Sequence, residues 1–512
     1  MSQFATPTPI SDLPPEILSS IFLLNTTVDS SYGVNYVKIL QDTARYTSQV
    51  CRQWRFLVLE NPVIWSQAID FTCGSHLWTE ELLRRASDRP LTLVSRYRSL
   101  SSDILARELE HVSRFGRYDG EFTDETWPLV RDKFQQSAPY LEELRLRGSS
   151  RAQYKLPATI FSGNAPRLRQ LWLQLCSFDD DLPYLAQLTH LSVSQFSLRN
   201  RQPKKWLNTL SRMKFLTDLE LKGVYIGIES HADVHLPNLK KISLTASLRE
   251  CSAFLSSLIL KPTCSMRVTA QNSLPGTDLD VTAGIIGQKL QLYLTKATQC
   301  NFPLYLHFGN EFFFVSNCLV SPTGATSEPE TPPYVSFRVS WPSLESGLLS
   351  ILPHLSSAFS GALSQATSLE LCLSSTLTCK THSAIANVLR QANNVTSLVR
   401  LNEQAANIFL HLEGVRRPIS THTKGEVIFP SLRTIHFGIE SYVDANRIIQ
   451  SLVDFIRYRI SIAAPLKAVY YTNQFHVSWV HVSWVQNGMG CLKKPGCWWQ
   501  KGNGFDTFIF YT

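Results

Sequence analysis

Apolar residues recur along most of the chain in a short pattern, Leu-x-x-Leu-x-Leu, in which the x positions are mostly polar. The last part of each copy alternates apolar and polar residues, so its leucines are expected to face one side of a strand. Clear copies begin at Leu141, Leu168, Leu188, Leu216, Leu239 and Leu432, and weaker ones at Leu369 and Leu398. The first five starts are separated by 27, 20, 28 and 23 residues. The pattern therefore predicts a series of similar strands separated by helical or irregular connections.

This spacing resembles that of leucine-rich repeats, in which each unit supplies one strand and one returning helix or loop. We expect residues 137–472 to form an irregular leucine-rich-repeat-like solenoid, a horseshoe of parallel strands, and the chain as a whole to be α/β. Leu144, Leu171, Leu219 and Ile242 are then expected to be buried in the same stacked position of successive repeats. Their parallel strands are expected to be joined by right-handed connections.

The repeat pattern fails over residues 263–343, which we interpret as degenerate repeats with an insertion. Within this stretch, residues 302–320 read as a β-hairpin, two β-rich runs separated by Gly309 and Asn310. Residues 321–333 are rich in proline, serine and threonine and are expected to form a loop. A helical bundle or a separate α+β domain is the alternative for the region.

The first seventy residues follow a different, helical pattern. Ser11 or Asp12 can accept hydrogen bonds from the amides of a first turn, and proline suits that turn because it lacks an N–H group. Apolar residues then recur at steps of three and four at Val37, Leu40, Ala44, Thr47, Cys51, Trp54 and Val58. Asn61 before Pro62 is expected to end this stripe. Residues 10–70 are thus predicted to form a small all-α domain.

Two segments of this domain resemble the F-box family, whose pattern begins with Leu-Pro-x-Glu-Ile/Leu-Leu and ends near Val-Cys-Arg-x-Trp-Arg. The chain has Leu13-Pro14-Pro15-Glu16-Ile17-Leu18 and Val50-Cys51-Arg52-Gln53-Trp54-Arg55. Residues 57–65, which follow, are similar to the version common in fungal F-box proteins. The two segments are farther apart than in the compact family pattern, so residues 25–34 are interpreted as an inserted loop.

The resemblance implies that this domain docks onto a Skp-type adaptor, which connects to a cullin-based ubiquitin ligase. The adaptor-binding residues that it implies are Leu13, Pro14, Pro15, Glu16, Ile17, Ile21, Val50, Cys51 and Trp54. The alternative is that these side chains only hold the small helical domain together. Replacement of Leu13 and Pro14 by alanine is predicted to abolish adaptor capture and to leave the repeats folded.

Composition narrows the class of protein further. Hydrophobic residues make up 44% of the 512 residues and charged residues 18%, which excludes a wholly disordered chain. A formal net charge of +8 is small for this length, so a dedicated nucleic-acid binder is disfavoured. Residues 1–9 lack the basic and apolar regions of a secretory signal, and no run is apolar enough to cross a membrane. We therefore expect a cytoplasmic or nuclear protein whose eleven cysteines are reduced.

No motif for covalent chemistry stands out, so the chain is interpreted as a non-enzyme without cofactor or metal. His231 and His235 have helical i,i+4 spacing, but a helix is not expected there and no further metal ligand is evident. A basic run that lacks acidic residues and includes Trp206 is a possible patch for an acidic partner or nucleic acid. Its members are Arg199, Arg201, Lys204, Lys205, Arg212 and Lys214. The alternative is a solvated helix face between two repeats.

Three further segments complete the expected domain organisation. Residues 1–9 are predicted to be a flexible N-terminus, and residues 71–136 a connecting helical segment. Residues 473–512 are predicted to be an atypical, disordered tail outside the folded domain, because leucine almost disappears there and His476-Val477-Ser478-Trp479-Val480 is repeated at once. A terminal capping hairpin is the alternative for this tail.

These expectations combine into one functional hypothesis. The chain is interpreted as the substrate-receptor subunit of a Skp-cullin-F-box ubiquitin ligase, with the repeats holding an unknown target protein near the ubiquitin-charged enzyme. The alternative is a non-catalytic leucine-rich-repeat scaffold that has no link to ubiquitination.

Overall fold

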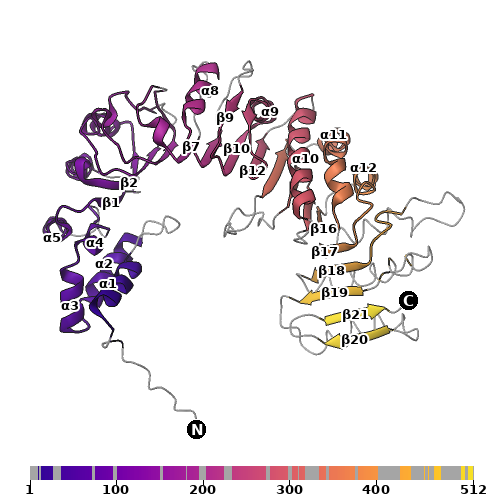
Figure 1. The fold of residues 1–512 in the computed structure, drawn as a ribbon, viewed down its shortest axis with the longest axis horizontal. Helices are drawn as coiled ribbons and strands as arrows, with labels where there is room; N and C mark the ends of the chain where they lie inside the picture. Colours follow the sequence, from indigo (N-terminus) through magenta and orange to yellow (C-terminus); the bar gives the residue numbers. More distant parts are fainter. Residues whose placement is uncertain are drawn as a thin grey trace, which may run out of the picture. The chain divides into compact units, whose positions relative to one another are not determined.

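The computed structural model describes most of the chain, which is mixed α/β with a large and mostly parallel sheet (Figure 1). The described residues are 10, 13–26, 36–67, 69–71, 75–95, 101–149, 154–179, 181–194, 203–223, 233–271, 277–297, 303–309, 311–317, 334–341, 345–374, 379–401, 427–439, 455, 459, 466, 468–473, 497–501 and 506–510. The chain divides into two compact units, and each is described by itself. Unit 1 comprises Met1–Tyr225 and Val234–Leu239, and unit 2 comprises Ile226–Asp233 and Lys240–Thr512.

Unit 1 begins with five helices, of which the first four lie within residues 10–70, where the apolar stripes predict helices. They are α1 (Pro15–Asn25), α2 (Tyr36–Thr47), α3 (Arg52–Leu59), α4 (Pro62–Ser66) and α5 (His76–Ala86). The core of this helical part is built from one face of each helix, and includes Leu18, Phe22, Leu40, Val58 and Trp65, none more than 3% exposed. The single stripe from Val37 to Val58 is thus divided between α2 and α3.

Six parallel strands of unit 1 follow one another in the sheet in chain order. They are β1 (Leu91–Ser95), β2 (Phe115–Phe122), β3 (Glu143–Gly148), β5 (Gln170–Gln174), β7 (His190–Ser194) and β8 (Asp218–Lys222). The short connections contain α6 (Ser102–Leu109), η2 (Val112–Arg114), α7 (Trp127–Lys133), β4 (Tyr154–Lys155), η3 (Ile160–Gly163), β6 (Cys176–Ser177), η4 (Leu185–Gln187), α8 (Pro203–Arg212) and β9 (Val234–His235). Neighbouring turns are tied together, since the amide of Thr217 donates to the carbonyl of Thr189 at 2.8 Å.

The leucines of the repeated pattern form a buried column in this sheet. Leu144 lies opposite Leu171, which lies opposite Leu191, which in turn lies opposite Leu219. Each of these four side chains is 1% exposed. The prediction that Leu144, Leu171 and Leu219 occupy the same stacked position on parallel strands is therefore confirmed in unit 1, and Leu191 belongs to the same column.

The expectation of a connecting helical segment over residues 71–136 is wrong, because β1 and β2 already belong to the parallel sheet. Tyr118 of β2 lies opposite Leu144, and Gly120 lies opposite Leu146. A Cβ at Gly120 would lie 2.5 Å from the Tyr118 ring, so the large ring fills space beside the glycine. Sequence reasoning missed this strand because tyrosine and glycine replace the two leucines of the pattern.

Unit 2 continues the same architecture with longer helices. Its strands are β10 (Lys241–Ser247), β11 (Leu258–Ile259), β12 (Ser265–Gln271), β13 (Leu304–Phe308), β14 (Phe312–Ser316), β15 (Val335–Ser340), β16 (Ser368–Leu373), β17 (Ser397–Leu401), β18 (Thr434–Ile439), β19 (Ala468–Asn473), β20 (Cys497–Lys501) and β21 (Asp506–Phe510). Its helices are α9 (Leu248–Ser256), α10 (Thr277–Ala297), α11 (Glu345–Gln365) and α12 (Cys379–Leu389). The last three lie side by side (Figure 1). Ile242 is 2% exposed and lies opposite Met266 on the parallel strand β12, so its predicted burial is confirmed.

The predicted hairpin around Gly309 and Asn310 is confirmed by the antiparallel strands β13 and β14. It does not form a separate domain, because β14 also pairs with β15, and β13 pairs in parallel with β16. Strand β14 is thus an antiparallel strand inserted between β13 and β15. The loop predicted over residues 321–333 lies outside the described residues.

The C-terminal residues differ in part from the expectation of a tail outside the folded domain. Strand β21 pairs with β19 in antiparallel fashion, and β20 pairs with β21. Both strands are short runs of aromatic, β-branched and polar residues, which suit a sheet without any leucine pattern. The repeated His-Val-Ser-Trp-Val segments and residues 1–9 lie outside the described residues.

Candidate functional site

The residues implied as adaptor-binding all lie at the surface of the helical part of unit 1. Six of them are exposed, namely Pro14, Pro15, Glu16, Ile17, Val50 and Cys51. The other three, Leu13, Ile21 and Trp54, are half-buried. None of the nine is fully buried, in contrast to the neighbouring core residues Leu18, Phe22 and Val58.

The geometry of α1 explains how exposed and buried apolar residues alternate. Pro14 precedes the helix, and its carbonyl accepts hydrogen bonds from the amides of Ile17 at 3.0 Å and Leu18 at 3.1 Å. Ile17 is 49% exposed, whereas Leu18, one residue further, is 0% exposed. A step of one residue rotates a helical side chain by about 100°, which separates the surface residue from the core residue.

The second implied segment lies at the start of α3. The Cys51 sulfur accepts a hydrogen bond from the amide of Trp54 at 3.5 Å and so caps the helix. The Trp54 ring packs against Phe22 of α1 with ring centroids 4.8 Å apart. This contact holds the two segments of the F-box-like pattern next to each other, although they are far apart in sequence.

Other large apolar side chains on the same helices are exposed, and sequence reasoning did not single them out. They are Ile10 before α1, Leu24 on α1, Ile39 and Tyr46 on α2, and Phe56 on α3, each at least 53% exposed. Their only signal in the sequence is that they fall outside the apolar stripes. Exposed apolar residues mark a surface for a protein partner where they form one contiguous patch.

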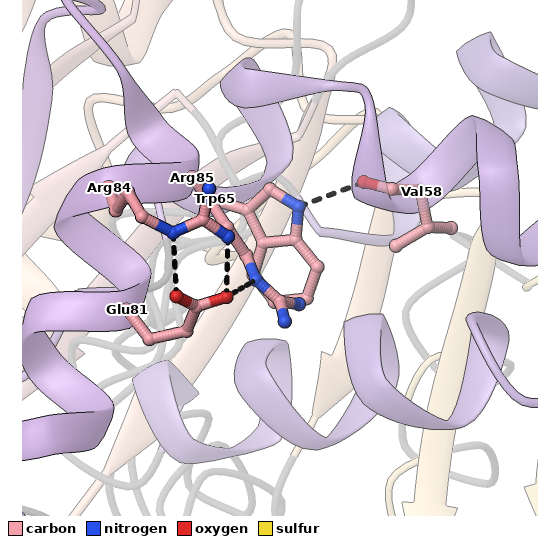
Figure 2. A network of polar contacts seen from close by, with 5 residues as sticks. All are labelled: Val58, Trp65, Glu81, Arg84 and Arg85. Carbon is pink, nitrogen blue, oxygen red and sulfur yellow. Dashed lines mark hydrogen bonds and ion pairs between the residues drawn. The ribbon is translucent and has the colours of Figure 1, made fainter.

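A polar network fixes α3, α4 and α5 relative to one another (Figure 2). The indole N–H of the buried Trp65 donates to the carbonyl oxygen of Val58 at 2.8 Å. The Arg85 guanidinium lies 4.7 Å from the centre of the Trp65 ring and also bonds Glu81 at 2.6 Å. Hydrogen bonds from Arg84 and Arg85 lower the pKa of Glu81 to about 2. The C-terminal end of α3 is thereby held in place.

The predicted basic patch is only partly described. Arg199 and Arg201 lie outside the described residues, and Lys204 and Lys205 lie on α8. Arg212 and Lys214 are exposed. Arg212 lies 4.0 Å from Asp181. Trp206 is 2% exposed and packs against Phe178, so its ring is not accessible to a nucleic-acid base.

A charged sheet face of unit 1, which sequence reasoning did not single out, comprises the x positions of the leucine pattern. Glu143 bonds Arg117 at 3.0 Å and Arg145 at 2.6 Å. The Arg145 guanidinium lies 4.1 Å from the centre of the Trp172 ring, and Trp172 is 6.2 Å from the His190 ring. The period-two alternation of the strands predicts such a face opposite the leucines, but not which of its charges pair.

Within the described part of the chain, no three His, Cys, Asp or Glu side chains are placed to hold a metal ion. His235 lies on the short strand β9, and His231 is not described. No helix among the described residues is long and apolar enough to span a bilayer. No protein-family model matches the chain, and no curated protein matches it.

Proposed function

We propose that the chain is the substrate-receptor subunit of a Skp-cullin-F-box ubiquitin ligase. Helices α1–α3 act as an F-box that docks onto a Skp-type adaptor. The parallel strands of both units act as an irregular leucine-rich-repeat-like solenoid that binds a target protein. The chain itself performs no covalent chemistry and acts in the cytoplasm or nucleus by raising the local concentration of the target.

The observation that carries this proposal is the exposure of the apolar residues of the F-box-like pattern. If Ile17 and Val50 served only the helical core, they would be buried like Leu18 and Val58. They are instead 49% and 61% exposed. Several large apolar side chains are exposed on one small helical part, and their removal from water by a partner would lower the free energy of the complex.

The sheet supports the second half of the proposal. Its stacked leucine columns leave the alternate, mainly polar positions on the opposite face of each strand. Stacked units of this kind present an extended surface to a protein partner. On the charged sheet face of unit 1, the Arg145–Trp172 pair combines a charge with a large ring, two residue types that are enriched at protein interfaces.

Co-purification tests the proposal. The tagged full-length chain should capture both a Skp-type adaptor and a cullin from a fungal lysate. Leu13→Ala/Pro14→Ala should lose both proteins, because it removes surface apolar area and the residue that starts α1. Leu216→Val, a conservative change in the buried leucine pattern, is the control and should retain them.

The rival function is a repeat scaffold without a link to ubiquitination. It predicts that neither adaptor nor cullin is captured, although the wild-type chain is folded. Capture that persists unchanged in the Leu13→Ala/Pro14→Ala variant would place the docking surface elsewhere and contradict the F-box assignment.

A further inference from the structure

Two arginines lie on the same face of the sheet in unit 2. Arg267 of β12 lies opposite Ser336 of β15, and Arg338 lies two residues further along β15. Side chains two residues apart on a strand share a face, so both guanidinium groups stand opposite the buried Val268 and Phe337. From the strand spacing and the rise per residue, their Cα atoms are about 8 Å apart.

Each guanidinium is placed against an aromatic ring. Arg338 lies 4.3 Å from the centre of the Phe312 ring, and Arg267 lies 5.5 Å from that of Tyr334. A guanidinium stacked in this way loses less freedom on binding, and its N–H groups at the rim remain able to bind a carboxylate. Arg267, Arg338, Phe312 and Tyr334 are all half-buried, so the group is reachable from solvent. We refer to these four residues as the arginine–aromatic face.

Neither arginine has a carboxylate within ion-pair distance among the described residues, unlike Arg117, Arg145 and Arg147 in unit 1. The buried Nε of Arg267 has no hydrogen-bond partner within the described part of the chain. Glu370, on the same sheet, lies on β16, which β13 and β14 separate from β15. This face therefore has an excess of positive charge.

The neighbouring titratable group does not reverse this charge. His307 of β13 packs edge-to-face against Phe312 with ring centroids 4.6 Å apart. Burial, together with the charge of Arg338, lowers the pKa of His307 to about 4. The imidazole is neutral at pH 7, so the two arginines carry the positive charge of the arginine–aromatic face.

We propose that the arginine–aromatic face binds an extended acidic segment of a protein partner, with carboxylates at alternate positions. Such positions in an extended peptide lie on one side, about 6.6 Å apart, which is close to the separation of the two arginines. Each guanidinium then binds one carboxylate through two N–H donors. The identification of this partner as the ubiquitination target rests on the proposed function, whereas the binding itself does not.

A single-stranded nucleic acid also binds arginine and aromatic residues, but the geometry favours a peptide. Bases need free ring faces on which to stack. Here Arg338 covers one face of Phe312, and His307 packs edge-to-face against Phe312. The rings thus support the guanidinium groups rather than form an open stacking platform.

Fluorescence anisotropy with the full-length chain tests the inference. The probes are a fluorescein-labelled peptide of alternating glutamate and serine, its counterpart with glutamine in place of glutamate, and an oligo-uridine. The wild-type chain should bind the glutamate peptide best. Arg267→Gln/Arg338→Gln should weaken that binding at least about tenfold, because charge-assisted hydrogen bonds are lost. Arg249→Gln/Arg433→Gln, which removes two exposed charges from α9 and from the turn before β18, is the matched control and should bind as wild type.

If Arg267→Gln/Arg338→Gln fails to fold, Arg338→Lys serves as the test in its place. This variant keeps the charge but loses the planar fork, so it should bind the glutamate peptide more weakly than wild type but better than wild type binds the glutamine peptide. Equal binding of the glutamate and glutamine peptides, tighter binding of oligo-uridine, or wild-type affinity of Arg267→Gln/Arg338→Gln would overturn the inference. Adaptor capture should be unchanged in Arg267→Gln/Arg338→Gln. Failure of peptide binding is therefore distinguishable from failure of the F-box assignment.

Discussion

Gly120→Ala is expected to destabilise unit 1, because Tyr118 already fills the space that a methyl group would need. The added Cβ would lie 2.5 Å and 2.6 Å from two atoms of the Tyr118 side chain, closer than atoms can approach without movement. The ring cannot easily give way. It stacks on Phe115 at 4.9 Å, meets Phe134 edge-on at 5.5 Å, and is 2% exposed.

The cost follows from this packing. Overfilling a well-packed core by one carbon atom costs about 1–3 kcal/mol, and a neighbour held on two sides places the value in the upper half of that range. The double variant Tyr118→Leu/Gly120→Leu restores the two leucines of the repeated pattern. It should therefore be more stable than Gly120→Ala, although it loses the aromatic contacts.

Urea denaturation of residues 1–239, monitored by circular dichroism, gives the free energy of unfolding of both variants and of wild type. The isolated region must first show a cooperative transition of its own. A free energy of unfolding for Gly120→Ala within about 0.5 kcal/mol of wild type would refute the packing argument. A double variant less stable than Gly120→Ala would show that β2 is not equivalent to the leucine-bearing strands.

Three further predictions concern other parts of the chain. Leu18→Ala should lower the free energy of unfolding by about 2–5 kcal/mol and Ile17→Ala by less than about 0.5 kcal/mol, because only Leu18 is buried. Similar losses for the two variants in urea denaturation would contradict this division between core and surface. The folded-state pKa of Glu81 lies below its usual value of 4.5, so its ion pairs stabilise the fold above pH 4.5 and are lost as the pH falls towards 2. Between pH 4.5 and 2, the free energy of unfolding of Glu81→Gln should fall less than that of wild type, with a difference of less than about 1 kcal/mol. Identical curves for the two proteins would exclude a stabilising role of the Glu81 ion pairs. Truncation after Asn473 removes the strand that pairs with β19 and should lower the melting temperature by a few degrees with adaptor capture retained, whereas an unchanged melting temperature would favour a tail outside the folded domain.

The repeated leucines made four of the six parallel strands of unit 1 predictable, namely β3, β5, β7 and β8. Leu171, Leu191 and Leu219 occur at equivalent places in their copies, and the structure pairs them directly. Strand β2 was missed because Tyr118 and Gly120 satisfy the same packing with one large and one absent side chain. A pattern that counts leucines does not detect such compensation, since what the fold requires is filled volume.

The candidate docking residues were predictable because they come from two compact segments. Pro14 and Cys51 stand at the starts of α1 and α3, where their local roles can be read from neighbouring residues. The arginine–aromatic face was not predictable in this way. Arg267 and Arg338 are 71 positions apart, and they are brought together by the pairing of β12 with β15, two strands that the hairpin separates in the sequence.

The exposed side chains of α1–α3 are proposed to bind a Skp-type adaptor. Isothermal titration of the purified chain with a purified fungal adaptor tests this proposal most directly. We predict a one-to-one complex with a sub-micromolar dissociation constant, strongly weakened in Ile17→Asp/Val50→Asp, a variant that changes surface positions only. No binding at an adaptor concentration of about 0.1 mM, which corresponds to a binding free energy weaker than about −5.5 kcal/mol, would contradict the account. Undiminished binding by Ile17→Asp/Val50→Asp would contradict it as well.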